Sequence, residues 1–299
     1  MAMETVYDRL VRDAVDLHCH IDVEFSQTLF RKAASEWEWL PEAEDAGMRA
    51  VVLKSHLWPT TTAIPYIREL YQGPVEVYGS ITLNTHAGGL DPWAVEAAAH
   101  LGAKAVFMPT WSSKNDAERG GFGRRLDEAF EHFDHQRLGV LSVLDEGQKL
   151  TDAASEIIRL VAEKDMMLST GHLSWRESLA IAQEAHRIGF DRVLCGHPLS
   201  GSVGAPHDAV REAAKLGAYI EFCWPTVSPG RHDPAEVVGL VGEIGAERAV
   251  FTSDFFGGSN PSPSSLLRLL LGTVYDAGLS EDAVRRAASD NPAALLGLK

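Results

Sequence analysis

Short apolar runs alternate with amphipathic segments along the whole chain. The runs are rich in β-branched residues and show no alternation of polar and apolar positions, which is typical of strands buried on both faces of a parallel sheet. We expect strands at residues 14–18, 50–54, 75–83, 103–110, 166–170, 192–196, 218–223 and 248–253.

The segments between these runs carry apolar residues at i, i+3 and i+4, which predicts helices with one buried face. These helices are expected at residues 62–71, 92–101, 153–164, 177–189, 208–217, 234–245 and 266–278. Strands that alternate with helices form right-handed βαβ units. The pattern therefore predicts an α/β fold, a (β/α)8 TIM barrel, and the length of 299 residues fits one domain over residues 1–299.

A ninth apolar run, residues 137–146, does not fit this rhythm. It falls between the fourth and fifth expected strands, where the spacing is about double the usual one. We interpret it as an insertion between strands 4 and 5, a hairpin or a short extra strand before the helix expected at 151–164.

Composition and charge exclude several classes of protein. Hydrophobic residues make up 45% and charged residues 23%, as in ordinary globular proteins. A net charge of −15 repels phosphate backbones and anionic membranes, so neither nucleic acid nor a membrane is expected as a partner. Cys19, Cys195 and Cys223 form no zinc or disulfide motif. With no apolar leader and no run of 18 apolar residues, we expect a cytoplasmic protein.

Polar residues gather where the apolar runs end, which in a barrel is the edge that carries the chemistry. They include two histidines on one strand, two on later strands and a carboxylate on the last, namely His18, His20, His172, His197 and Asp254. One histidine at a strand end is more often a hydrogen-bonded structural residue. The complete set predicts a site for one or two divalent metal ions, zinc above manganese or iron.

These motifs resemble those of the amidohydrolase superfamily of metal-dependent hydrolases. They occur in the order DxHxH, GH, GH and SD, formed by Asp16, His18, His20, His172, His197 and Asp254. The tail SDNPAALLGL (289–298) is similar to the final-helix signature of many members. The resemblance implies a distorted TIM barrel and a metal-activated water. It also implies that Asp254 carries the proton and that His197 binds a second metal or the oxyanion.

The chain departs from the superfamily pattern in two ways. Only about 13 residues precede the first strand, which leaves no room there for a flanking β-sandwich and favours a compact member. Strand four ends in Met108-Pro109-Thr110-Trp111, so it supplies neither the lysine nor the glutamate that bridges two metals in binuclear members.

Lys54 ends the second strand and is a further candidate ligand. A neutral amine there, favoured by burial, could take up carbon dioxide and become an anionic carbamate. Two other interpretations remain open, a cationic contact for an anionic substrate or a lysine that extends to solvent.

Other residues at strand ends are candidates for substrate binding. His56 follows Lys54, and three tryptophans, Trp58, Trp111 and Trp224, follow strands two, four and seven. Glu221 on strand seven faces either the substrate or a metal-ligating histidine. The loop RGGFGRR (119–125) is either a lid for a carboxylate or an ordinary solvated loop.

The favoured activity is metal-dependent hydrolysis of a C–N bond in an amide or cyclic amide of a small molecule, or of a related ester or lactone. The alternatives are decarboxylation of a small aromatic acid, cleavage of a phosphoester, and binding of a ligand by a metal-containing barrel without turnover. A homo-oligomer is compatible with the sequence.

Overall fold

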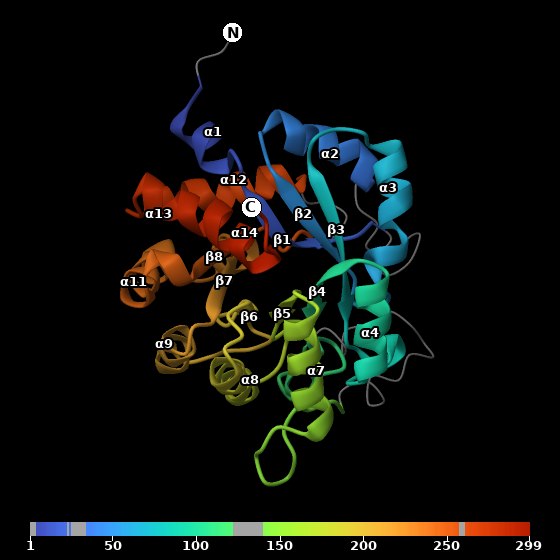
Figure 1. Ribbon diagram of the computed structural model, residues 1–299. Coiled ribbons are helices and arrows are strands. Elements are labelled where there is room, and N and C mark those ends of the chain that lie inside the picture. Colours follow the sequence, from blue (N-terminus) through green and yellow to red (C-terminus); the bar gives the residue numbers. More distant parts are fainter. Residues whose placement is uncertain (1–3, 23, 25–33, 122–139, 257–260) are drawn as a thin grey trace.

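The eight expected strands form one parallel sheet in the computed structural model, which describes residues 4–22, 24, 34–121, 140–256 and 261–299. The strands pair in sequence order, and a bridge between Cys19 and Phe255 brings the first strand to the segment after the eighth. The fold is therefore the predicted TIM barrel (Figure 1). The strands are β1 (Val15–His20), β2 (Ala50–Lys54), β3 (Glu76–Thr82), β4 (Ala103–Phe107), β5 (Met167–Ser169), β6 (Val193–Cys195), β7 (Tyr219–Cys223) and β8 (Ala249–Thr252).

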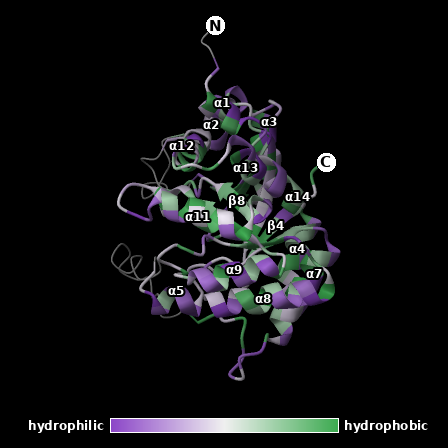
Figure 2. Cartoon of the chain, turned by 90° about the vertical axis from the view of Figure 1, so that its left-hand side faces the viewer, coloured by the Kyte–Doolittle hydropathy of each residue, from purple (hydrophilic) through white to green (hydrophobic). Residues whose placement is uncertain are grey.

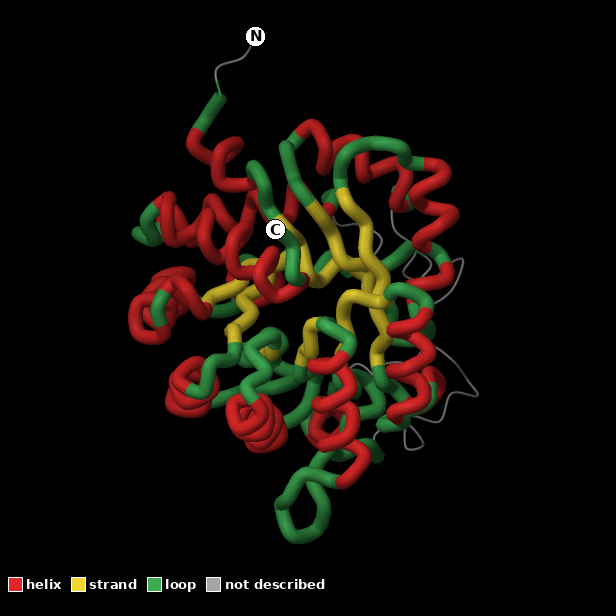
Figure 3. The backbone as a smooth tube through the Cα atoms, in the orientation of Figure 1, coloured by secondary structure: helices red, strands yellow, loops and turns green. Residues whose placement is uncertain are grey.

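Helices surround the strands, as Figure 3 shows. The α-helices in the described residues are α1 (Val6–Val11), α2 (Glu36–Asp45), α3 (Ile64–Leu70), α4 (Pro92–His100), α5 (Lys114–Glu118), α7 (Asp152–Glu163), α8 (Trp175–Ile188), α9 (His207–Lys215), α10 (Trp224–Val227), α11 (Pro234–Ile244), α12 (Pro263–Asp276), α13 (Glu281–Arg285) and α14 (Asn291–Leu296). Polar and apolar residues alternate along α8 and α9 (Figure 2), as expected for helices with one face on a sheet. Among the described residues, no helix combines the length and the apolar character that crossing a bilayer requires.

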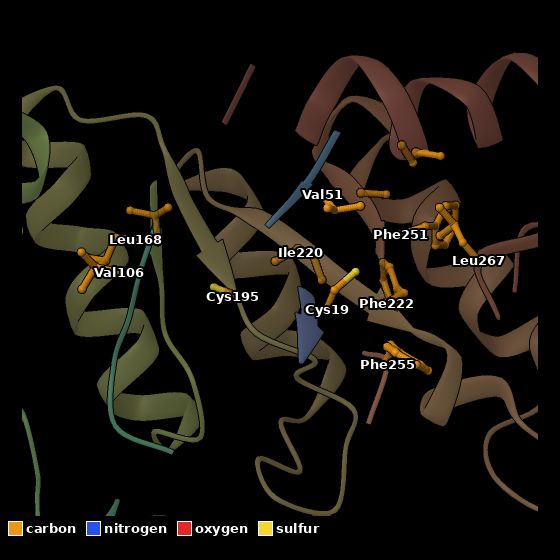
Figure 4. Packing of buried hydrophobic residues seen from close by; sticks show 14 of the residues in the cluster. Cys19, Val51, Val106, Leu168, Cys195, Ile220, Phe222, Phe251, Phe255 and Leu267 are labelled. Atoms are coloured by element: carbon orange, nitrogen blue, oxygen red, sulfur yellow. The ribbon is translucent and has the colours of Figure 1, made fainter. Parts of the chain in front are cut away.

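Within the described part of the chain, buried apolar side chains form two separate clusters. The inner cluster collects residues from all eight strands, as only the inside of a barrel can: Val15, Leu17, Ala50, Val52, Ala105, Phe107, Met167, Leu194 and Val250, with Tyr78 and Tyr219 packed against them. The outer cluster lies between strands and helices, and Figure 4 shows part of it around Phe222, Phe251 and Leu267.

Helix α14 covers the inner cluster at the amino ends of the strands. Its Ala293, Leu295 and Leu296 belong to that cluster. Asn291 Nδ2 donates to the carbonyl oxygens of Ala246 and Ala249, at the beginning of β8. One end of the barrel is thus closed by apolar packing, which leaves the carboxyl ends for the polar residues.

The ninth apolar run forms an irregular connection rather than a regular strand. Residues 137–139 lie outside the described part. Beyond them, Leu141 bridges Ser113 in parallel and Leu144 bridges Leu150 in antiparallel fashion. The insertion before α7 is therefore a minimal hairpin, one of the two forms expected.

Candidate metal centre

The carboxyl ends of five strands bring the predicted ligands to one place. His18 and His20 end β1, Lys54 ends β2, and His172, His197 and Asp254 follow β5, β6 and β8. The ring centroid of His18 lies 5.2 Å from that of His20 and 5.6 Å from that of His197. The His172 and His197 ring centroids are 5.1 Å apart. Residues distant in the sequence therefore form one buried cluster.

A register shift in β1 determines where its histidines point. Asp16 pairs with Val51 and Cys19 with Leu53, so β1 holds one residue more than β2 between these pairs. Leu17 contacts the inner cluster, whereas Cys19 packs in the outer cluster. The bulge thus turns His18 and His20 to the inside after Leu17, as a bulge typically redirects side chains. The expectation that both histidines share one side and Cys19 the other agrees with this packing.

Asp254 and the two histidines of β1 present three atoms at the spacing of metal ligands. Asp254 Oδ1 lies 3.3 Å from His18 Nε2 and 3.4 Å from His20 Nε2. Two ligands of a tetrahedral ion with bonds of about 2.0–2.2 Å are about 3.3–3.6 Å apart. The three atoms therefore fit a shared divalent cation.

Carboxylates hold the opposite nitrogen of three histidines. His18 Nδ1 donates to Glu221 Oε1 at 2.9 Å, and His20 Nδ1 donates to Glu24 Oε2 at 3.0 Å. The pairs continue at His172, whose Nδ1 lies 2.8 Å from Asp116 Oδ1. A carboxylate at Nδ1 fixes the tautomer and leaves Nε2 with the lone pair that binds a metal. His197 differs, because its Nδ1 is 3.1 Å from the Ser200 hydroxyl.

Glu221 supports the cluster from beneath. Oε1 accepts from His18 Nδ1 and from the Thr252 hydroxyl at 2.8 Å, and Oε2 accepts from the backbone amide of His197 at 2.8 Å. Both carboxylate oxygens are thus used within the protein. Of the two interpretations of Glu221, the contact with a metal-ligating histidine is the one the geometry favours.

Lys54 is buried inside the cluster. Its side chain is 1% exposed, and Nζ lies 3.1 Å from His18 Nε2. Burial lowers the pKa of Lys54, although the negative charges of Asp254 and Glu24 act in the opposite direction. The interpretation of Lys54 as a lysine that extends to solvent is wrong, because the side chain does not reach water. The carbamate and the cationic contact remain as alternatives.

The charge states of the cluster suit a cation. Burial by itself raises the pKa of Asp254, but the adjacent His18, His197 and Lys54 lower it overall, so the carboxylate stays ionised. Burial, followed by the charge of Lys54, holds the pKa of His18 well below its ordinary value. An ionised carboxylate beside neutral imidazoles is the state in which these groups bind metal.

Unusual backbone conformations place three of the ligand loops. His197 and Asp254 have φ angles of 24° and 46°, in the left-handed region that non-glycine residues avoid. Gly171, just before His172, has φ of 58°, and a Cβ there would lie 2.3 Å from the carbonyl oxygen of Met108. Only glycine fits this crossing of the loops after β4 and β5.

The three tryptophans that are candidates for substrate binding differ in burial and in their distance from the histidine cluster. Trp111 is buried and stacks on His56, with ring centroids 3.9 Å apart and planes at 20°. Phe256 stands edge-on to His20 at 4.9 Å. Trp58 is 63% exposed and lies 6.2 Å from the ring of His86. Trp224 begins α10 and packs against the outer cluster.

Two carboxylates of the site, Glu24 and Asp116, were not predicted from the sequence. Neither belongs to a motif: Glu24 follows His20 by four residues, and Asp116 lies in α5. Their only sequence signal is an acidic residue in the segment that follows a strand ending in histidine, as for Glu24, or that follows the neighbouring strand, as for Asp116. Residues 122–125 of the expected lid loop lie outside the described part of the chain. Arg119 of that loop donates to the carbonyl oxygen of Gly201 at 2.7 Å.

Comparison with known families places the sequence in a family whose function is unknown. The profile of a family of unknown function, DUF6282, matches residues 13–221. The chain belongs to this family. No curated protein matches the sequence significantly.

Solved structures share the barrel at low sequence identity. An amidohydrolase from Pseudomonas aeruginosa is 13% identical, with a TM-score of 0.59 over 97% of this chain and 98% of that chain. A metallo peptidase from Rhodobacter sphaeroides, liganded with a phosphinate mimic of the dipeptide L-Ala-D-Ala, is 13% identical. Its TM-score is 0.58, and the match covers 95% of this chain and 99% of that chain. A dihydroorotase is 14% identical, with a TM-score of 0.53, and the match covers 96% of this chain and 70% of that chain. These likenesses confirm the barrel fold that the sequence predicts.

Proposed function

We propose that this protein is a metal-dependent hydrolase that cleaves a C–N bond, or a related ester or lactone bond, in a small molecule. The observation that carries the proposal is the set of three histidines whose Nδ1 atoms are held by buried carboxylates. An arrangement of this kind prepares the Nε2 atoms for a metal rather than for a purely structural hydrogen bond.

His18, His20 and Asp254 would hold the first ion, with His172 and His197 available to it or to a second ion. A divalent cation supplies a water that is deprotonated near neutral pH and a Lewis acid for the scissile carbonyl. Nitrogen and oxygen donors of this number favour zinc. A carbamate on Lys54 would add an anionic ligand for a two-ion site, whereas a charged Lys54 would favour one ion and an anionic substrate.

Asp254 is the residue we propose for proton transfer. It is ionised, and its Oδ1 lies 3.3 Å from His18 Nε2 and 3.4 Å from His20 Nε2. A carboxylate at this position accepts a proton from the attacking water and returns it to the departing amine or alkoxide. The left-handed backbone at Asp254 fixes where that carboxylate lies.

The similar structures favour amide chemistry, since they include an amidohydrolase and a metallo peptidase. The test is a panel of dipeptides, N-acyl amino acids, cyclic amides, lactones and aromatic carboxylates. The protein would be assayed after zinc loading, after chelation, and after zinc is restored.

We expect hydrolysis of at least one amide class, its loss on chelation and its recovery with zinc. Full activity after exhaustive metal removal would overturn the proposal. Release of carbon dioxide from an aromatic acid without any hydrolysis would replace the hydrolase with a decarboxylase.

A further inference from the structure

His56 is a buried polar residue of the same site to which the proposed mechanism gives no role. It follows β2, is 4% exposed, and lies between the indole of Trp111 and the candidate ligands. Its ring centroid is 4.7 Å from that of His20 and 5.9 Å from that of His172. The position of its single proton therefore determines what a substrate meets beside the metal.

The orientation of the Asn84 amide is fixed by the backbone. Asn84 Oδ1 accepts from the amides of Thr110 and Ser112 at 2.9 and 3.0 Å. If the amide were flipped, its NH2 group would face the two backbone N–H groups, and no acceptor would be present. Nδ2 must therefore lie on the other side. There it donates to the carbonyl oxygen of His56 at 2.9 Å and to Thr110 Oγ1 at 2.7 Å.

The Thr110 hydroxyl transmits this orientation to His56. Thr110 is fully buried, and its oxygen already accepts from Asn84. Its own proton therefore goes to His56 Nδ1, 2.7 Å away, which is its remaining hydrogen-bond partner in the described part of the chain. The opposite assignment would leave a buried hydroxyl proton without an acceptor, which proteins avoid.

An imidazole that accepts at Nδ1 is neutral and carries its proton on Nε2. No residue in the described ranges accepts a hydrogen bond from that Nε2–H. His56 therefore has the opposite tautomer to His18, His20 and His172, which donate from Nδ1 to carboxylates. Three histidines present lone pairs to a cation, and a fourth presents a donor beside them.

We propose that His56 is a substrate-binding residue whose Nε2–H donates to the carbonyl oxygen of the substrate, and that Asn84 and Thr110 are positioning residues that hold this tautomer. The inference rests on the proposed hydrolase and refines its substrate class. A neutral donor held in one orientation beside the candidate metal ligands suits the oxygen of an uncharged carbonyl group, as in an amide or cyclic imide, better than the anionic oxygens of a phosphoester.

The tautomer is tested without any substrate by long-range ¹H–¹⁵N NMR on the zinc-loaded full chain labelled with ¹⁵N-histidine. The His56 signals are assigned by their loss in His56→Gln. We expect a protonated Nε2 and an unprotonated Nδ1 in the wild type. Thr110→Val should move the proton toward Nδ1 or mix the two forms, and Thr110→Ser should restore the wild-type pattern. Protonation at Nδ1 in the wild type would overturn the inference.

Activity provides the second arm once a substrate is found in the panel. His56→Phe keeps the ring and loses the donor, so we expect kcat/KM to fall about 10²–10³-fold, as on removal of other preorganised donors. Thr110→Val should lower it by a smaller factor and Thr110→Ser should recover it. Unchanged kcat/KM in His56→Phe would overturn the substrate contact.

The two arms separate this inference from the proposed function. Chelator-sensitive hydrolysis with a proton on His56 Nδ1 rejects the inference and keeps the hydrolase. A proton on Nε2 without hydrolysis of any panel member rejects the hydrolase and the substrate contact together, and it leaves the assigned tautomer standing.

Discussion

The two ends of the barrel differ in polarity: the inside is apolar at the amino ends of the strands and polar at their carboxyl ends. Toward the amino ends, the inner cluster contains Val15, Val52 and Val250 and is covered by α14. Two to four residues further along the chain, at or just after the carboxyl ends of the same strands, lie His18, Lys54 and Asp254. The comparison indicates that the apolar end supplies the stability that allows the other end to bury polar groups at a cost. If the two ends are separable, a substitution at one end should leave the property of the other end unchanged.

The largest effect is expected at Asp254. Asp254→Asn keeps the size of the side chain but removes the base and a ligand charge, so hydrolysis should fall about 10²–10⁴-fold. Unfolding in urea, measured in parallel, should show a much smaller loss of stability than a substitution in α14. An inactive variant that is also unfolded would contradict the separation of the two ends.

Leu295 tests the apolar end. It is fully buried in the inner cluster, so Leu295→Ala should lower the free energy of unfolding by about 2–5 kcal/mol through lost burial and a cavity. The matched control is Leu101→Ala, because Leu101 is 56% exposed and its truncation should change stability by less than about 0.5 kcal/mol. The activity of the folded fraction should remain that of the wild type, and a lower kcat would show that the ends are coupled.

Glu221 and Asp116 test the contacts behind the ligands. Glu221→Gln and Asp116→Asn weaken the carboxylate–histidine bonds, and zinc affinity measured by competition with a chelator should fall about 10–100-fold. Glu236→Gln is the control, since Glu236 bonds His207 and His232 outside the site. Equal losses in all three variants would assign the effect to general destabilisation.

The smallest effect is a pH dependence of the metal-free protein. Burial lowers the pKa of His18, His56 and His197 from the ordinary value of 6.5, so the unfolded chain binds protons that the folded chain does not. The contribution of these three imidazoles to stability should therefore be complete above about pH 6.5 and be lost as the pH falls below it, by up to about 1.4 kcal/mol per pH unit for each proton. Urea unfolding between pH 5 and 8 measures this slope, and a flat profile would contradict it.

Much of the fold follows from local patterns. Each expected strand is present, because a run buried on both faces of a parallel sheet is apolar throughout and needs no information from its partners. The expected strands at 166–170 and 192–196 each extend one residue beyond β5 and β6 at either end. The helix α2 was not expected, since it follows a long segment without a clear period.

The site could be predicted only where strands place it. The candidate ligands stand at strand ends, so topology alone brings His18, His172 and Asp254 together. Glu24 comes from a loop and Asp116 from the short helix α5, and the path of both segments depends on contacts that spacing does not encode. The bulge in β1 could not be predicted either, because the sequence DLHCH is compatible with a regular strand and only its pairing with β2 shows the extra residue.

Helix α14 has a consequence for biosynthesis. It follows all eight strands in the chain, so a ribosome has made the whole sheet before the segment that covers the inner cluster emerges. Until then the nascent barrel has uncovered valine and leucine side chains at one end, which is the kind of surface that chaperones bind and that promotes aggregation. Shortening the chain within residues 291–298 should therefore reduce soluble yield in cells more than it alters any contact with a ligand.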